Sequence, residues 1–156
     1  MVTATVEDLV NREIALDARR IKPEIRVVMR MFDQELAAKV RGAFDIDLCF
    51  STSAIAAPLF ATSSSDRTIV NAFRVGEKLL VVAEIEILPQ SQLVGQSVRA
   101  LRMAHNIYIV AHRRGEKTHY YPDGDVELCS GDVVTLQTEP DTLRIVHDLN
   151  GDREAA

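Results

Sequence analysis

"VTATVEDLVNREIALDARRIKPEIRVVMRM", residues 2–31, is the stretch that decides the fold of the first part of the chain. Its first ten residues predict the end of a buried strand, a polar turn and the start of a helix. Apolar side chains recur at helical spacing as far as Ile21, which predicts an amphipathic helix. Pro23 ends that helix, and the β-branched run over residues 24–31 predicts a strand.

The same alternation continues after this stretch. Apolar side chains at helical spacing over residues 32–44, with Asp33 as the N-cap, predict a second helix. Residues 46–51 predict a second strand. Alternating helices and strands imply parallel strands with helices on the faces of the sheet. The first part therefore predicts an α/β fold, a partial Rossmann-like half in the order helix, strand, helix, strand.

Two segments link this half to the rest of the chain. Residues 51–65 are small, apolar and rich in Ala, and predict a short helix that is kinked or ended near Pro58. This helix is either an ordinary covering helix or one that packs in a dimer. Residues 63–73 predict a polar break and another short helix, and Gly76-Glu77 closes the first part.

A different pattern begins near residue 78. Strict alternation over residues 82–87 predicts a half-exposed strand. The predicted elements that follow are, in order, a helix over residues 93–104, a hairpin around Arg114-Gly115, a strand over residues 133–138 and a helix from Pro140. The second part is therefore a small α+β unit.

Composition excludes several classes of protein. The chain has 156 residues and a formal net charge of −5, and its basic clusters, such as Arg113-Arg114, are short. Phosphate contacts need clustered Lys and Arg, so we expect no nucleic-acid partner. No apolar run reaches the roughly 18 residues of a membrane-spanning helix, and no secretory signal opens the chain. We therefore expect a cytoplasmic protein without direct membrane insertion.

Two kinds of functional motif are missing from the sequence. The seven glycines include no GxGxxG loop, so no row of backbone N–H groups is available for a pyrophosphate. NAD or ATP is therefore expected only with the help of a complementary half. No nucleophile has a nearby base, and no GxSxG elbow occurs, so we expect no enzymatic activity.

The motifs taken together resemble the RCK family, also called KTN or TrkA, which regulates K⁺ channels and Trk- and Ktr-type uptake systems. "DLVNREIALDARRIKPEIRVVMRMFDQELA" (8–37) and "FSTSAIAAPLFA" (50–61) resemble the back half of its N-terminal lobe. "LVGQSVRALRMAHNIYIVAHRRG" (93–115), Pro122 and "LCSGDVVTLQTEPDTLRIV" (128–146) resemble its C-terminal lobe, TrkA-C. The first three strands of a complete N-lobe have no counterpart in this sequence.

The resemblance implies a division into two domains and a tail. Residues 1–77 would be a partial RCK N-lobe, residues 78–150 the TrkA-C lobe, and residues 151–156 a tail. In the family, the turn after the fourth strand borders a nucleotide, and Thr3, Thr5, Glu7 and Asn11 match that turn. Arg30 would face the same crevice. Alternatively, Glu7 is a first-turn acid favoured by the helix dipole, and Arg30 forms a surface salt bridge.

The resemblance also implies a ligand site in the C-lobe. Some members bind cyclic di-AMP in the cleft between two paired C-lobes, beside an arginine and an Asn-Ile pair. Asn106 and Ile107 match the pair, and Arg102 is the nearest arginine before it. Arginine can chelate a phosphate bidentately, and isoleucine can pack on a purine. The alternative is that Asn106 only caps a turn and that Arg102 is solvated.

Two groups of side chains bear on metal binding. Asp123, Asp125 and Glu127 resemble the start of a calcium loop, but the glutamate at its twelfth position is missing. Because some RCK proteins bind Ca²⁺, the acids are either a calcium site or an acidic turn. His112 and His119 lie on adjoining predicted strands, where partnered or exposed histidines are favoured over a metal site.

The resemblance implies a regulatory function. We expect a ligand-sensing module that acts through rearrangement of a homodimer or ring, at the inner face of the membrane, on a potassium channel or transporter subunit. The helix over residues 52–62 would cross over between N-lobes. Two alternatives stay open: a remnant of a Rossmann NAD-dependent oxidoreductase, and a stand-alone cyclic-dinucleotide sensor.

Overall fold

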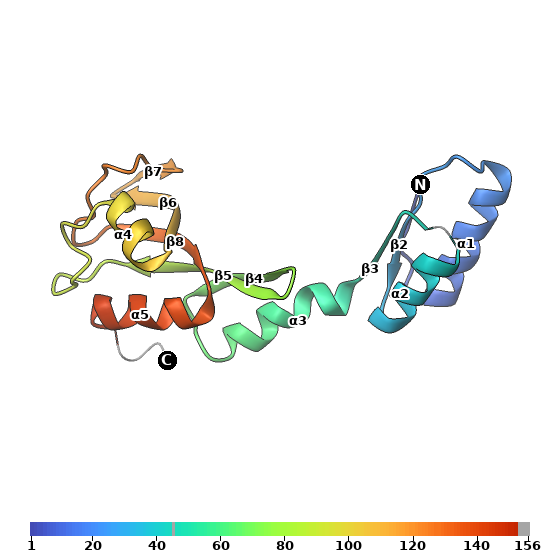
Figure 1. The fold of residues 1–156 in the computed structure, drawn as a ribbon, viewed down its shortest axis with the longest axis horizontal. Helices are drawn as coiled ribbons and strands as arrows, with labels where there is room; N and C mark the ends of the chain where they lie inside the picture. The colour runs from blue at the N-terminus through green and yellow to red at the C-terminus, as the bar shows by residue number, and fades with distance from the viewer. Residues whose placement is uncertain (45, 153–156) are drawn as a thin grey trace. The chain divides into compact units, whose positions relative to one another are not determined.

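A computed structural model describes residues 1–44 and 46–152. The chain forms two compact units, Met1–Ala57 and Pro58–Ala156, and helix α3 (Thr52–Ser63) crosses the division between them (Figure 1). The predicted fold class is confirmed, because a parallel three-stranded sheet with helices precedes a five-stranded antiparallel sheet with helices. Within the described ranges, no helix is long and apolar enough to cross a membrane.

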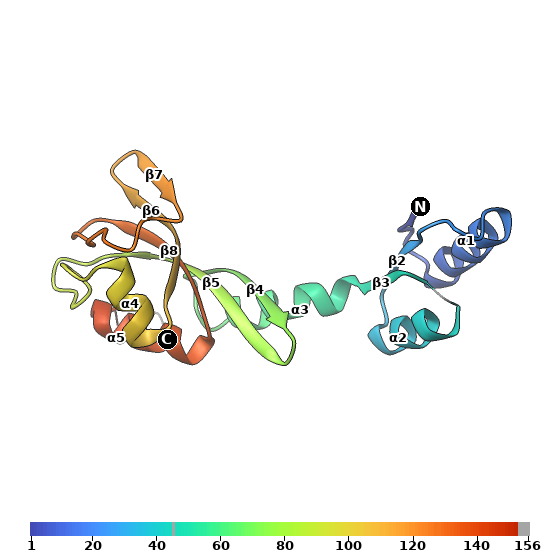
Figure 2. The same ribbon diagram turned by 45° about the horizontal axis from the view of Figure 1, so that its top comes forward.

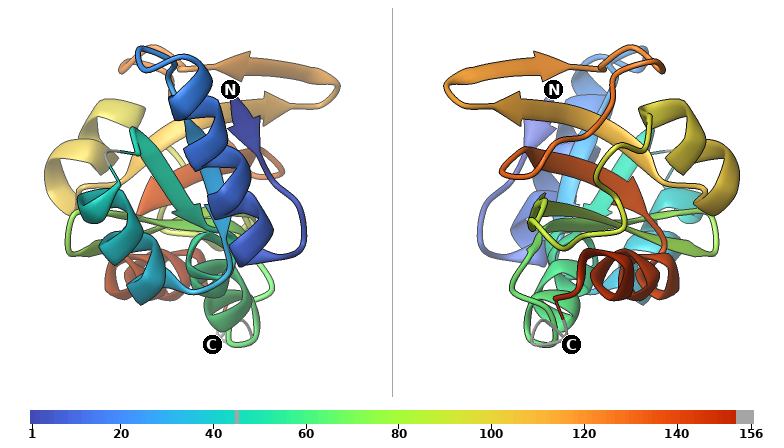
Figure 3. Two further views of the ribbon diagram at one scale, coloured as in Figure 1. Left: turned by 90° about the vertical axis from the view of Figure 1, so that its right-hand side faces the viewer. Right: turned by 90° about the vertical axis from the view of Figure 1, so that its left-hand side faces the viewer.

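The first unit contains one small parallel sheet. Its strands are β1 (Val2–Thr3), β2 (Val28–Met31) and β3 (Leu48–Ser51), in the spatial order β1-β2-β3. Helices α1 (Asp8–Ile21) and α2 (Gln34–Ala43) connect them and lie on the same side of the three strands (Figure 3). The helix-strand-helix-strand order therefore agrees with the sequence pattern.

Local signals explain where these elements start and what they bury. Asp33 is the N-cap of α2, as predicted, and its side chain accepts hydrogen bonds from the N–H groups of Glu35 and Leu36. The core between the sheet and its helices consists of Ala15, Val27, Met29, Met31, Ala37, Val40 and Ile46. The opposite side of the sheet carries Phe50, which is 45% exposed. Within residues 1–44 and 46–57, α1 and α2 cover one face of this sheet.

The second unit contains a five-stranded antiparallel sheet. Its strands are β4 (Ile69–Val75), β5 (Lys78–Glu86), β6 (Tyr108–Arg114), β7 (Lys117–Tyr120) and β8 (Val133–Thr138). They lie in the order β4-β5-β8-β6-β7, so β4 and β7 are the edges. The β6–β7 hairpin is most easily followed in Figure 2.

Two helices complete the core of this unit. α4 (Val98–His105) contributes Val98 and Leu101, and α5 (Pro140–Asn150) contributes Leu143 and Val146. These side chains pack with buried strand residues such as Val81, Ile85, Ile109 and Leu136 in one cluster. Burial of this cluster is the main source of stability of the unit, since apolar burial dominates folding.

One predicted element is wrong. Residues 63–73 were expected to contain a short helix, but residues 69–75 form strand β4. Val75 pairs with Lys78, so Gly76-Glu77 is a two-residue hairpin turn, with Gly76 at a φ of 61°. Because β4 pairs with β5, residues 58–77 belong to the second compact unit rather than to the first. Residues 153–156 of the predicted tail lie outside the described residues.

Candidate ligand-binding site

A cleft beside α4 is a candidate site of the second unit. It has a volume of about 710 Å³, within the range of small-molecule pockets. We call it the α4 cleft. Its lining residues come from α4, from the start of β6 and the residue before it, from the loop after β7 and from β8: Val98, Arg99, Arg102, Met103, Ile107, Tyr108, Ile109, Val110, Tyr121, Pro122, Gly124 and Gln137.

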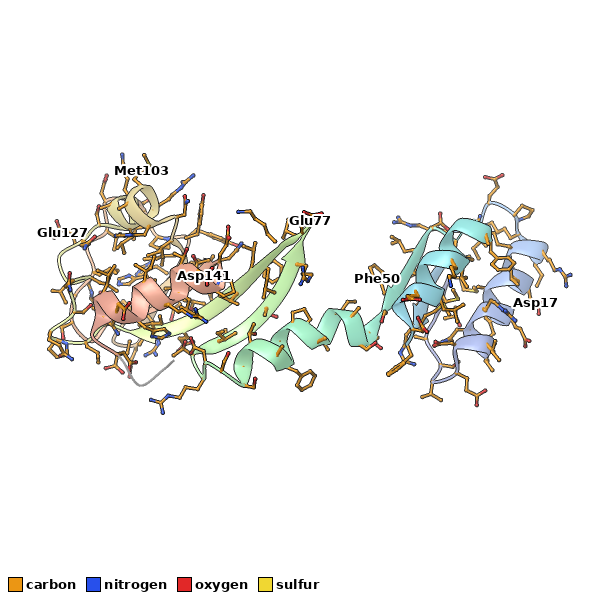
Figure 4. All side chains as sticks on the ribbon, turned by 60° about the horizontal axis from the view of Figure 1, so that its bottom comes forward. Asp17, Phe50, Glu77, Met103, Glu127 and Asp141 are labelled. Carbon is orange, nitrogen blue, oxygen red and sulfur yellow. The ribbon has the colours of Figure 1, made fainter. Side chains whose placement is uncertain are left out.

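Helix α4 presents its polar side to the cleft for a simple reason. Ser97 caps the helix by accepting a hydrogen bond from Ala100 N–H at 3.2 Å, and Leu101 faces the core with 2% exposure. Residues 99, 102 and 103 lie on the opposite side, since positions three and four apart share a helix face. Figure 4 shows Met103 projecting outward, in agreement with its 81% exposure.

Two arginines define the electrostatics of the cleft. The guanidinium of Arg102 lies over the Tyr108 ring, 5.1 Å from its centroid, in a cation–π contact. Arg99 forms an exposed ion pair with Asp125 at 2.9 Å. Gly124 lets the loop approach closely, because a Cβ at this position would lie 3.1 Å from Arg99 Nε. The loop therefore holds one arginine and the tyrosine ring orients the other.

The cleft combines three chemical features that a nucleotide ligand needs. Guanidinium groups can bind phosphate oxygens. Tyr108 and Tyr121 offer aromatic faces, and the buried side chains of Ile107 and Ile109 form an apolar floor. Ligand pockets typically combine a small number of convergent polar groups with a mainly apolar surface.

The structure separates the three C-lobe residues suggested by the sequence. Arg102 and Ile107 line the α4 cleft, but Asn106 does not. Asn106 is the C-cap of α4, in the left-handed conformation with a φ of 55°, and its N–H donates to Arg102 O. Its side chain borders a smaller neighbouring cavity that Tyr108 also lines. Arg99 was missed, although its spacing of three residues from Arg102 placed it on the same helix face.

The family of this unit follows from a direct comparison of the sequence with family models. The TrkA-C domain model matches residues 82–150. Residues 82–150 are a TrkA-C domain. The match confirms the resemblance to the C-terminal lobe of the RCK family. It contains every lining residue of the α4 cleft, so the cleft belongs to the TrkA-C domain.

Three solved structures illustrate what this chain is similar to. The GsuK channel bound to NAD has 17% identity and a TM-score of 0.39, over 97% of this chain and 27% of that chain. The RCK C domain of the potassium transport protein KtrA in complex with cyclic di-AMP has 23% identity and a TM-score of 0.38, over 43% and 79%. S. agalactiae BusR in complex with its busAB-promotor DNA has 15% identity and a TM-score of 0.44, over 97% and 60%. No curated protein matches the chain.

One expectation about partners needs correction. The sequence was expected to exclude nucleic acid as a partner, but the similar BusR is bound to promoter DNA in two structures. The charge argument was too broad, because it concerned only this chain, which covers 60% or 65% of the BusR chains. A shortage of basic clusters in one domain does not exclude nucleic-acid binding by a protein that contains such a domain.

The nucleotide-side residues predicted in the first unit form one hydrogen-bonded cluster. Asn11, with 0% exposure, accepts from Thr3 Oγ1 at 2.9 Å and from Thr5 N–H at 2.7 Å. Its amide nitrogen donates to Thr5 O at 2.9 Å and to Arg30 O at 3.1 Å. All hydrogen-bonding positions of the Asn11 amide are therefore used inside the protein.

The remaining residues of this cluster do not fit a dinucleotide either. Arg30 donates to Thr5 O at 2.6 Å and to Thr52 Oγ1 at 3.4 Å, and it forms no salt bridge within the described chain. Glu7 is the N-cap of α1 without a side-chain capping bond, and its negative charge would repel a phosphate. Near the end of β1, the Asn11 amide is fully used inside the protein and Arg30 already binds Thr5 O and Thr52 Oγ1.

The acidic turn of the TrkA-C domain makes contacts other than metal coordination. Asp125 is paired with Arg99, and the N–H of Val126 donates to Asp123 O. Within residues 1–44 and 46–152, no three His, Cys, Asp or Glu side chains are arranged to hold a metal ion. His112 and His119 are direct cross-strand neighbours, as their positions in the sequence suggested.

A buried carboxylate just before β8 binds side chains of the neighbouring strand β6. Asp132, with 1% exposure, accepts from His112 Nε2 at 2.8 Å, from the Arg114 guanidinium at 2.7 and 2.8 Å, and from Cys129 N–H at 2.7 Å. Burial opposes ionisation, but the hydrogen bonds from Arg114, His112 and Cys129 outweigh it and hold the pKa of Asp132 well below its ordinary value.

A second, partly buried carboxylate leads to a prediction about acid stability. Asp66 accepts from His147 Nε2 at 2.9 Å and from Thr68 at 2.6 and 2.8 Å. Burial by itself would raise the pKa of Asp66. The hydrogen bonds from Thr68 and His147 lower this pKa by a larger amount, so it lies below its usual value. A carboxyl with a lowered folded pKa stabilises the fold above its unfolded pKa, about 3.9, and this contribution is lost as the pH falls through the folded pKa.

We therefore expect the thermal midpoint of the second unit to fall steeply below about pH 4. Thermal unfolding followed by tyrosine fluorescence between acidic and neutral pH measures it, since Tyr108, Tyr120 and Tyr121 all lie in that unit. Asp66→Asn should lower the midpoint at neutral pH and flatten the acid limb. An acid limb as steep as that of the original chain would show that Asp66 contributes nothing to it.

Proposed function

We propose that this chain is a non-catalytic, ligand-sensing regulatory module of a potassium transport system, with the α4 cleft as its sensing site. The observation that carries the proposal is the cleft itself: a TrkA-C domain presents Arg99 and Arg102 beside Tyr108 and Tyr121 over an apolar floor. No group in this cleft is a nucleophile with a neighbouring base, so the arrangement favours binding over reaction.

A cyclic dinucleotide is the ligand class that suits this cleft. Such a molecule carries two phosphodiester anions and two purines, which need guanidinium donors and aromatic or apolar walls. Cyclic di-AMP is the first probe, because it is the ligand in the KtrA structure and in the RCK_C domain dimer of BusR. NADH and ATP are the comparison probes, since NAD is bound in the GsuK channel.

Regulation would work through pairing of two copies. Met103 and Tyr121, each 81% exposed, put apolar surface on the rim of the cleft, which a second TrkA-C domain would cover. A ligand shared by two copies stabilises the paired arrangement because it binds the paired copies more tightly than the separate ones. At the cytoplasmic side of a membrane, this rearrangement would be transmitted to a potassium channel or transporter subunit.

Replacing Arg102 tests the sensing site. Arg102→Ala is expected to raise the dissociation constant for cyclic di-AMP roughly 20-fold, because a charge-assisted bond to phosphate is lost. Isothermal titration calorimetry measures the effect. Arg144→Ala is the matched control, since Arg144 is a 76% exposed arginine on α5 outside the cleft, and its replacement should leave the affinity unchanged.

Different results would support different functions. Equal affinity of the original chain and Arg102→Ala, or no binding of cyclic di-AMP, would reject the α4 cleft as the sensing site. Oxidation of NADH by the chain would favour an oxidoreductase remnant. The original chain could bind cyclic di-AMP while cells that carry the Arg102→Ala allele show unchanged K⁺ uptake. That result would favour a stand-alone cyclic-dinucleotide sensor.

A further inference from the structure

A second cavity lies on the β6–β7 hairpin, on the other side of the chain segment that borders the α4 cleft. We call it the hairpin pocket. It has a volume of about 630 Å³ and shares only Tyr121 and Pro122 with the α4 cleft. Its other lining residues are His112, Arg114, Lys117, His119, Tyr120, Asp123 and Val126.

The sheet register gathers nitrogen-bearing side chains on one face of this hairpin. His112 pairs directly with His119, and Arg114 pairs directly with Lys117. Residues two apart along a strand project to the same side, and so do directly opposed residues of antiparallel strands. The four side chains therefore form a two-by-two array on one face of the hairpin. The register of the two backbones sets this array, whichever rotamers the side chains adopt.

Arg114 is held in place before any ligand arrives. Its Nε and Nη2 donate to the two oxygens of Asp132 at 2.8 and 2.7 Å, and Nη2 also donates to Glu127 O at 2.8 Å. The guanidinium also interacts with the side chain of Cys129. A guanidinium that is already fixed loses little conformational entropy when it binds an anion.

The other cations of the pocket have unused hydrogen-bonding capacity. Lys117 and His119 are exposed, and neither side chain makes a hydrogen bond or ion pair within residues 1–44 and 46–152. The acid of the lining is Asp123, while the charge of the buried Asp132 is shared among His112, Arg114 and Cys129 N–H. Asp132 balances the charge of Arg114, so an anion would be bound mainly through the unused N–H donors of Lys117 and His119 and the charge of Lys117.

The aromatic side chain of Tyr121 also lines the hairpin pocket and offers a surface for a flat ring of the ligand. Tyr121 is 81% exposed and has a φ of 52°, a left-handed conformation that is uncommon outside glycine and clusters at functional sites. Its N–H is fixed by a hydrogen bond to Val110 O at 2.9 Å. We propose that the hairpin pocket binds a small phosphate-bearing ligand with a flat ring, the phosphate on Arg114, Lys117 and His119 and the ring against Tyr121.

Calorimetric titration of the full chain with adenosine 5′-monophosphate, adenosine and inorganic phosphate tests this site. Adenosine 5′-monophosphate should bind saturably, and adenosine should bind at least about tenfold more weakly because it lacks the charged contacts. The double variant Lys117→Gln/His119→Gln should weaken the nucleotide by a similar factor. Both side chains are exposed, so the fold should persist, and Lys117→Gln alone replaces the double variant if its thermal midpoint falls.

Two matched variants make the result decisive. Arg113→Gln removes a cation from the same strand but from the opposite face, where Arg113 lies 3.8 Å from Glu84, and it should leave the affinity unchanged. Arg102→Ala shows whether adenosine 5′-monophosphate binds in the α4 cleft instead of the hairpin pocket. Absence of saturable binding at millimolar nucleotide, or loss of binding in Arg102→Ala but not in Lys117→Gln, would overturn the proposal without affecting the cyclic di-AMP test.

Discussion

Replacing Asp132 with asparagine is expected to lower the free energy of unfolding of the second unit by about 3 kcal/mol. Every neighbour of this buried carboxylate is a donor: His112 Nε2, Arg114 Nε and Nη2, and Cys129 N–H. An asparagine amide has only one oxygen, so in either orientation its NH₂ group faces at least one of these donors. The variant also leaves the Arg114 cation without its counter-charge.

Urea unfolding followed by tyrosine fluorescence measures this change, because all three tyrosines lie in the second unit. Asp125→Asn is the control, since it also removes a carboxylate paired with an arginine, but one whose side chain is 86% exposed. Exposed ion pairs contribute little, so the control should unfold almost like the original chain. Equal stability of the two variants would mean that the Asp132 network does not hold the end of the sheet together.

Local signals in the sequence predicted most of the elements because short-range chemistry determines them. Pro23 follows α1, Asp33 caps α2, and Pro140 begins α5, each as expected. Strand β4 was missed because its identity depends on pairing with β5, and the segment alone has no clear period. The signal that could have found it is Gly76-Glu77, a two-residue turn of the kind that closes β-hairpins.

The candidate sites were harder to predict because they depend on long-range pairing. The Asp132 network joins residues 18 and 20 positions apart across β6 and β8, and no local spacing reveals it. The alignment of Lys117 with Arg114 follows from the hairpin register, which becomes certain only when the strands are seen. By contrast, the family pattern alone pointed to Arg102, which lines the α4 cleft together with Arg99.

The two candidate pockets suggest a division of roles within the second unit. The α4 cleft lies beside exposed apolar side chains such as Met103, which a second copy would cover under the proposed function. The hairpin pocket is built from the edge strand β7 and its neighbour β6. Tyr121 and Pro122 line both cavities, so a ligand that moves this segment in one pocket also changes the wall of the other.

In the first unit, Asn11→Ala is expected to cost roughly 3 kcal/mol of stability. The amide of Asn11 is fully buried and makes four hydrogen bonds, to Thr3 Oγ1, to the N–H and C=O of Thr5 and to Arg30 O. Alanine leaves these backbone groups without a partner and creates a small void. Hydrogen-exchange mass spectrometry of residues 1–57 measures the effect, because this unit contains no tyrosine.

Two further variants separate hydrogen bonding from packing at this position. Asn11→Asp keeps the shape but turns two donated hydrogen bonds into contacts between oxygens, so it should destabilise the unit about as much as alanine. Glu13→Ala changes an exposed residue of the same helix and should leave amide protection unchanged. If Asn11→Ala exchanges no faster than Glu13→Ala, Asn11 does not hold the first unit together, and a ligand-binding role for its amide regains support.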